Sequence, residues 1–258
     1  MNKLYAPLAV SLAATLVSAN AQASDWLLWQ DNSISYLAGK GFKVHPDHQQ
    51  TITFEHADAW KYGDNFFFID LTRFNGKKGQ NLGKTVHYGE LSSRLSAGKI
   101  FDRPFTLGPI KDVLLAMTYE FGEKDVEAYL IGPAVDLNVP GFDYLSLNFY
   151  RRYNEGSNDG SNVWQITPTW AITIPVGRSD ILFDGYMDWV TDNDRGYHSN
   201  LHFNPQVKYD LGKAMGWSAK QLYVGIEYSY WKDKFGIEDT RAFHTNQSAT
   251  SALVKLHF

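Results

Sequence analysis

The chain has 258 residues, 24 of them basic and 28 acidic, so its formal net charge is −4, and it contains no cysteine. The absence of cysteine excludes a disulfide framework and a thiolate metal site, and the lack of a basic excess argues against binding to nucleic acid. Phe, Trp and Tyr make up 15% of the residues, although the mean hydropathy is negative. Membrane β-barrels combine these two properties, because half of their strand residues face water and aromatic girdles line their rims.

The N-terminus has the pattern of a secretory signal peptide. Lys3 supplies a positive charge, residues 4–19 form an uncharged and mainly apolar run, and Ala21-Gln22-Ala23 is a small-x-small cleavage pattern. The apolar run is too short for a membrane-spanning helix, although an uncleaved helical anchor is the alternative. We therefore expect residues 1–23 to be a signal peptide and residues 24–258 to form one folded domain.

The last nine residues predict a strand with two different faces. Thr250, Ala252, Val254, Leu256 and Phe258 are mostly apolar, and the residues between them are mostly polar. Such period-two alternation is typical of a soluble sheet, and also of a membrane barrel whose apolar face meets lipid. A chain that ends on an aromatic residue in such a strand resembles the sorting signal of bacterial outer-membrane barrels.

Eleven further segments alternate in the same way, and each spans roughly ten residues, which is the length that a tilted strand needs to cross a bilayer. The domain of 235 residues (258 − 23) leaves about twenty residues for each strand and its connection, and strand numbers in such barrels are even. We predict an all-β fold, a single transmembrane antiparallel β-barrel of about 12 strands, with ten or fourteen strands or a soluble β-sandwich as alternatives. The predicted segments are 33–39, 50–60, 65–74, 86–95, 110–121, 126–135, 144–153, 163–174, 180–190, 201–211 and 222–230.

Connections and prolines refine this prediction. If the C-terminus is periplasmic, residues 61–64 and 176–179 are short periplasmic turns and residues 232–246 form a long outer loop, as barrels of this kind require. Residues 98–109 and 212–220 are long for periplasmic turns. Pro168 and Pro205 lie inside strand patterns, where each removes a ladder donor, so we expect a bulge or a rim position at both.

The faces opposite the apolar ones are the candidate lining of a lumen. They carry acidic groups, two arginines and several aromatic rings, which could hydrogen-bond and stack with a solute; the alternative is that the charges pair across a small lumen and stiffen it. If the alternation within a strand is misplaced by one residue, the predicted inward and outward faces of that strand are exchanged. The predicted lining residues are Phe66, Phe68, Asp70, Glu90, Arg94, Glu120, Tyr150, Arg152, Asp184, Tyr186, Asp188 and Glu227, with Asn148, His202 and Tyr223 as further candidates.

Several segments resemble the nucleoside-specific channels of Gram-negative outer membranes, the Tsx-like channels, and their OmpK relatives. The likeness runs in the same order over most of the domain, and the Leu-Gly-Pro stretch and the Glu-x-x-x-Arg strand are its most specific parts. The resemblance implies a monomeric twelve-stranded barrel that passes nucleosides and deoxynucleosides, and some members of the family also serve as phage or colicin receptors. The loops differ most. The similar segments are 53–55, 66–70, 90–96, 105–111, 145–150 and 228–233.

Together these observations predict a bacterial outer-membrane channel for passive, selective diffusion of nucleosides or similar small aromatic solutes. Its partners would be outer-membrane lipid, the solute and, at the outer loops, a bacteriophage. The main alternative is a surface receptor with little transport. We expect no cofactor, because the sequence contains no phosphate-binding or calcium-binding loop pattern.

A lipid-modifying enzyme is the least favoured possibility. Ser92, His87, His202 and His257 could be nominated for acyl transfer, but no spacing singles out a nucleophile. A metal site is equally weak as a prediction, since its candidate ligands look like residues of an exposed loop and a strand end. Those candidates are His45, Asp47, His48 and His56.

Overall fold

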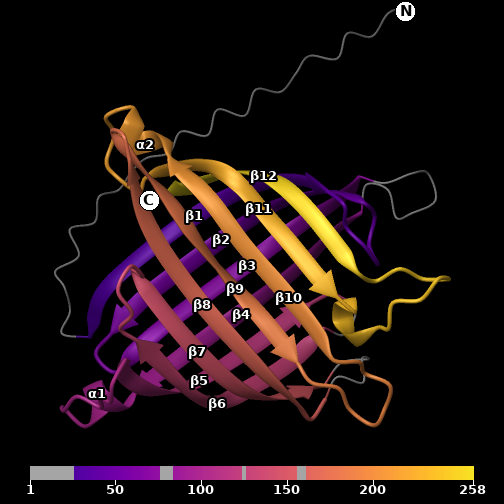
Figure 1. The fold of residues 1–258 in the computed structure, drawn as a ribbon, viewed down its shortest axis with the longest axis horizontal. Coiled ribbons are helices and arrows are strands. Elements are labelled where there is room, and N and C mark those ends of the chain that lie inside the picture. Colours follow the sequence, from indigo (N-terminus) through magenta and orange to yellow (C-terminus); the bar gives the residue numbers. More distant parts are fainter. Residues whose placement is uncertain (1–25, 76–83, 124–125, 156–160) are drawn as a thin grey trace, which may run out of the picture.

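The computed structural model describes residues 26–75, 84–123, 126–155 and 161–258. Within them, twelve antiparallel strands close into one barrel, in which neighbours in sequence pair with each other and β1 pairs with β12 (Figure 1). The predicted all-β barrel of twelve strands is therefore confirmed. The predicted signal peptide, residues 1–23, lies outside the described residues.

The strands are 11 to 14 residues long, and each predicted segment overlaps one of them. β1 begins six residues before the predicted segment, because a register shift between Leu27 and Trp29 and three polar residues obscure the alternation there. The strands are β1 (Leu27–Lys40), β2 (His48–Trp60), β3 (Gly63–Asn75), β4 (Thr85–Ser96), β5 (Ile110–Gly122), β6 (Glu127–Leu137), β7 (Tyr144–Asn154), β8 (Val163–Val176), β9 (Ser179–Val190), β10 (Asn200–Asp210), β11 (Leu222–Lys232) and β12 (Gln247–His257).

Burial alternates along the strands and identifies the inner face of the barrel. In β12, Leu253 and Lys255 are buried, whereas Val254 and Leu256 are 46% and 42% exposed. Because the sheet is closed, the buried positions point inward and the exposed apolar positions point outward, toward lipid. The C-terminal residue is held at the seam of the barrel, where the backbone N–H of Phe258 donates to the carbonyl of Asn32 at 2.9 Å.

The prolines correct one expectation. Pro168 and Pro205 lie neither at a bulge nor at a rim, since the register on both sides of each is unshifted. Each keeps its pairing with one neighbouring strand, Pro168 with β7 and Pro205 with β9. On the other side of each proline the pairing is interrupted, between β8 and β9 at Pro168 and between β10 and β11 at Pro205. Pro133 behaves in the same way between β5 and β7, so β6 is not shortened by it.

The two ends of the barrel differ, and we call the end where β1 begins and β12 finishes the terminal end, and the opposite one the loop end. Two single-turn helices, α1 (Ala97–Ile100) and α2 (Leu211–Ala214), lie at the terminal end (Figure 1). They lie in the connections after β4 and β10, where the sequence indicated turns that are long for the periplasmic side. Each is capped by the residue before it, because the side chains of Ser96 and Asp210 accept backbone N–H groups. No helix in the described ranges is long and apolar enough to span a membrane.

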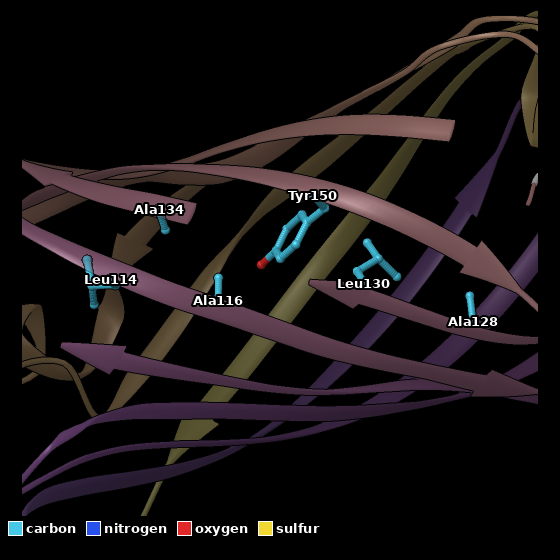
Figure 2. Packing of buried hydrophobic residues seen from close by; sticks show 6 residues of the cluster. All are labelled: Leu114, Ala116, Ala128, Leu130, Ala134 and Tyr150. Atoms are coloured by element: carbon cyan, nitrogen blue, oxygen red, sulfur yellow. The ribbon is translucent and has the colours of Figure 1, made fainter. Parts of the chain in front are cut away.

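Part of the interior is filled by side chains instead of water. Tyr150 of β7 lies over small residues of β5 and β6, which leave room for its ring (Figure 2). Its hydroxyl is 3.4 Å from the Thr118 hydroxyl on the inner face of β5. This packing narrows the passage on one side of the barrel. The cluster comprises Leu114, Ala116, Ala128, Leu130, Ala134 and Tyr150.

Candidate functional site

All twelve predicted lining residues lie at inward positions of their strands. Inward Asp70, for example, accepts a hydrogen bond from the buried Thr53 hydroxyl at 2.6 Å, and Phe66 and Phe68 share its side of β3. Glu120 and Tyr150 are among the most buried side chains, whereas Phe66 is 40% exposed. The placement fits the predicted faces, and what these residues do with a solute stays a prediction.

Three aromatic rings form a continuous arc on the inner face of β3 and β4. The ring centroids of Phe66 and Phe68 are 6.0 Å apart, and those of Phe68 and Tyr88 are 5.8 Å apart. Tyr88 was not among the predicted lining residues, although it is two residues from Glu90 and therefore on the same face of β4. The arc presents aromatic surface to the lumen near the middle of the strands.

Two carboxylates border this arc and have only neutral donors. Asp70 accepts from the Thr53 hydroxyl, and the Tyr88 hydroxyl donates to Glu90 at 2.6 Å. Glu90 lies directly opposite Phe68 in the ladder between β3 and β4. An aromatic surface with carboxylate acceptors at its edge can bind a solute that carries a flat ring and several hydroxyl or amino donors.

Other inward charges pair with each other, as the alternative interpretation of the lining proposed. Arg152 donates to both oxygens of Glu120 at 2.5 Å and to Gln165, and Lys208, which is 1% exposed, donates to Asp184 at 2.7 Å. These pairs connect strands that are neighbours or next neighbours in the wall and restrain them. Two further pairings are Arg94 with Asp64 and Asp136, and Lys255 with Glu55.

At the loop end, the connection between β11 and β12 contacts inward residues of the wall. The ring of His202 stacks on Trp231 with centroids 4.1 Å apart, and Phe235 of the short helix η1 (Lys234–Gly236) packs against Trp231 edge-on. Lys234 is buried and donates to the inward Gln247 side chain at 2.6 Å. The connection therefore forms part of the mouth of the lumen.

The same connection is fastened by one carboxylate. Asp239 accepts the backbone N–H groups of Thr245 at 2.7 Å and Asn246 at 2.9 Å, and these donors lower its pKa. The carboxylate is thus ionised at neutral pH, and its contribution is lost only as the pH falls through the lowered pKa. Asp239→Ala should loosen the loop and accelerate tryptic cleavage after the exposed Arg241 severalfold. Glu238→Ala, which removes a neighbouring exposed carboxylate, is the control and should leave the cleavage rate unchanged.

A cavity of about 530 Å³, lined largely by charged residues, opens at the terminal end, beneath α1. Its walls include the carboxylates of Asp64 and Asp136, which also bind Arg94, and the cation of Lys99. Asp112 fastens α1 to this mouth by accepting the backbone N–H of Gly98 at 3.1 Å. Charged side chains therefore line this end of the interior.

The residues nominated for metal binding are not brought together. His56 faces outward and contacts Asn32 and Asp58, whereas His45 packs on Phe74 and Phe235. In the described part of the chain, no three His, Asp or Glu side chains form a possible metal site.

The histidines nominated for acyl transfer do not contact Ser92. The hydroxyl of Ser92 lies 2.8 Å from that of Thr118, and His202 is 3.0 Å from the hydroxyl of Ser229 instead. His257 contacts Asp31 at 2.7 Å, and His87 lies 4.0 Å from Glu123.

Solved structures support the barrel assignment. The KdgM porin superposes with a TM-score of 0.51 and 11% identity, over 88% of this chain and 99% of that one. A structure of the KdgM porin in complex with disordered oligogalacturonate gives a TM-score of 0.50 at 12% identity, with the same coverage. At these identities the likeness concerns the fold alone. No curated protein sequence matches the chain significantly.

The sequence itself gives a more specific match. The family described as "Nucleoside-specific channel-forming protein, Tsx" matches residues 24–257, which is nearly the whole predicted domain. The match confirms the resemblance found in the sequence, and with the barrel fold it places the protein in the bacterial outer membrane as a channel for small solutes. The chain belongs to the family of nucleoside-specific channel-forming proteins.

Proposed function

We propose that the barrel is a passive channel selective for nucleosides or similar small aromatic solutes. The observation that carries this proposal is the arc of Phe66, Phe68 and Tyr88, bordered by Asp70 and Glu90. Membership of the family supports the same conclusion. No energy source is required, because a pore with weak binding sites conducts down a concentration gradient.

The chemistry of the arc matches that of a nucleoside. The base is flat and neutral, and stacking on an aromatic side chain contributes roughly 1–3 kcal/mol per base in proteins that bind single-stranded nucleic acid. The sugar carries hydroxyl donors, for which Asp70 and Glu90 offer acceptor oxygens that neutral side chains satisfy only in part. Such a site binds through a few weak contacts and therefore releases its solute quickly enough for transport.

The proposal is tested by nucleoside block of single-channel conductance in planar bilayers. Adenosine and thymidine should reduce the ion current at concentrations where ribose and glucose have no effect. Phe68→Ala should raise the half-blocking concentration about 5- to 150-fold, which corresponds to the loss of one stacking contact of roughly 1–3 kcal/mol.

Phe67→Ala provides a matched control for this experiment. Phe67 is adjacent in β3 but points outward, where its ring packs against those of Phe54 and Phe121. Its removal should leave the half-blocking concentration unchanged. Equal block by nucleosides and sugars, or equal effects of the two substitutions, would count against the proposal.

A receptor role is the second candidate, and one observation favours it. Phe243 is 48% exposed in the connection between β11 and β12, close to the hydrogen bonds that fasten the loop to Asp239. An exposed aromatic ring on a fastened loop at the outer surface is a suitable contact for a phage protein. Phe243→Ser should then reduce phage adsorption while nucleoside block is preserved, and unchanged adsorption by a panel of phages would argue against this role.

A further inference from the structure

The strands direct more carboxylates than cations into the lumen. Each of their four inward Lys and Arg side chains already lies within ion-pair distance of a carboxylate, as described above. Six inward carboxylates have no basic side chain at that distance in the described part of the chain. Two of them, Asp112 on β5 and Asp210 on β10, lie at the terminal end and accept backbone N–H groups around α1 and α2. The other four lie on other strands. They are Asp70 on β3, Glu90 on β4, Asp188 on β9 and Glu227 on β11.

Among the described residues, these four carboxylates are hydrogen-bonded by neutral groups only. The donors to Asp188 are the side chains of Thr167 at 2.6 Å and Gln165 at 3.1 Å, and Glu227 accepts from Gln206 at 2.8 Å. In each case the bonds reach one carboxylate oxygen, and the other has no donor among the described residues. The negative charge is therefore not balanced locally.

The unpaired carboxylates are distributed around the passage. Asp70 and Glu90 lie on the adjacent strands β3 and β4, whereas Asp188 and Glu227 lie on β9 and β11. Glu90 also lies directly opposite Glu120 in the ladder between β4 and β5. Charges of one sign in a passage with low-dielectric walls concentrate the field and raise the local concentration of counter-ions.

A second observation is independent of the charges. Three inward side-chain oxygens are buried without a donor among the described residues, those of Asn148, Asp184 and Asn204, and Asn148 is only 5% exposed. The indole N–H groups of Trp60 and Trp170, the unpartnered buried donors, both belong to outward positions. These oxygens can coordinate a metal cation or accept a hydrogen bond from an ammonium group, whereas they offer nothing to an anion.

Lysine side chains at the two mouths oppose this field. Lys234, at the loop end, donates to Gln247 and has no carboxylate partner in the described ranges. Lys99, at the terminal end, donates to the carbonyls of Trp60 and Gly63. These lysines lie at the ends of the passage, whereas the four carboxylates lie on strands of its wall.

From the unpaired inward carboxylates and the orphaned inward acceptors, we infer that the passage selects by charge and conducts small cations, including organic ammonium ions, in preference to anions. Rings of Asp and Glu produce this selectivity in cation channels. The inference rests on the barrel being an open channel and is independent of whether nucleosides bind to the arc.

The test is the reversal potential of the purified protein in a planar bilayer under a KCl gradient. We expect a permeability for K⁺ that exceeds that for Cl⁻ severalfold. Replacing chloride by gluconate should change the conductance little, and choline should carry current in place of K⁺. A reversal potential of zero, or one of the opposite sign, would overturn the inference.

Amide substitutions assign the selectivity to the carboxylates. Asp188→Asn combined with Glu227→Gln, both outside the aromatic arc, should bring the permeability ratio severalfold closer to one. Glu127→Gln is the matched control, because this carboxylate faces outward between the Tyr119 and Tyr129 hydroxyls, and it should leave the ratio unchanged. An unchanged ratio in the double variant would refute the assignment.

The outcomes also separate this inference from the proposed nucleoside selectivity. Cation-selective current without nucleoside block would leave the inference standing and contradict the nucleoside proposal. Non-selective current with nucleoside block would contradict the inference and leave the nucleoside proposal standing. A protein that passes neither ions nor nucleosides would overturn both.

Discussion

Arg152→Met should destabilise the barrel by about 3–5 kcal/mol, because removal of one partner from a buried ion pair leaves the other charge uncompensated. Glu120, whose side chain is 8% exposed, would remain with no cation, while its ladder neighbour Glu90 carries a like charge. Like charges directly opposite each other weaken an antiparallel pair further. Gln165 would also lose a donor. The loss should appear as a lower midpoint of urea unfolding in detergent micelles.

Two controls separate the buried pair from the general effect of losing an arginine. Arg151→Met removes the neighbouring arginine, whose contact with Asn162 is solvent-exposed, and should cost less than about 1 kcal/mol. Combining Arg152→Met with Glu120→Gln removes both charges and should recover much of the loss. Equal destabilisation by Arg151→Met and Arg152→Met would show that the pair contributes nothing special.

Inward charges are therefore ion-paired on one part of the wall and unpaired on another. Around β5 to β8, the packing of Tyr150 and the pairing of Arg152 with Glu120 make a rigid surface with few groups free for a solute. On β3 and β4, Asp70 and Glu90 have no basic partner among the described residues and lie beside the aromatic arc. We propose that the rigid side fixes the width of the passage while the other side binds the solute.

Much of this architecture follows from local sequence. Alternation alone placed Glu90 and Arg94 inward and Leu91 outward, since successive side chains of a strand point to opposite faces. The same rule placed Asp184, Tyr186 and Asp188 on the inner face of β9. The strand count followed from the length of these segments, because each must cross the same bilayer.

The pairing partners could not be predicted in this way. Lys255 pairs with Glu55 across 200 residues of sequence, and this contact exists only because β12 closes the barrel against β1. Arg94 was predicted to line the lumen, but its two carboxylate partners lie on different strands and hold it against the wall. The expected bulge at Pro205 failed for a related reason: β9 keeps its register with β10, and only the pairing toward β11 is interrupted.

The outward orientation of the apolar faces has a direct consequence for an added charge. Leu91 lies near the middle of β4, is 50% exposed and points outward beside Phe67 and Tyr119, its ladder partners. Leu91→Arg should therefore destabilise the protein by about 2–4 kcal/mol in a bilayer, the cost of Arg at the midplane of the lipid face. Reversible unfolding in liposomes measures this difference. Leu91→Ala separates the loss of the leucine from the charge.

An outward position at a different depth in the membrane provides the second control. Leu256 also points outward, but it lies near the terminal end of β12, where the headgroups begin. Leu256→Arg should cost only about 0–1 kcal/mol, because the penalty falls toward the interface. If both positions faced a dry protein interior, as in a soluble sandwich, Arg would be costly at each and the dependence on depth would vanish. A large penalty at Leu91 with a small one at Leu256 is therefore expected only when lipid surrounds the barrel.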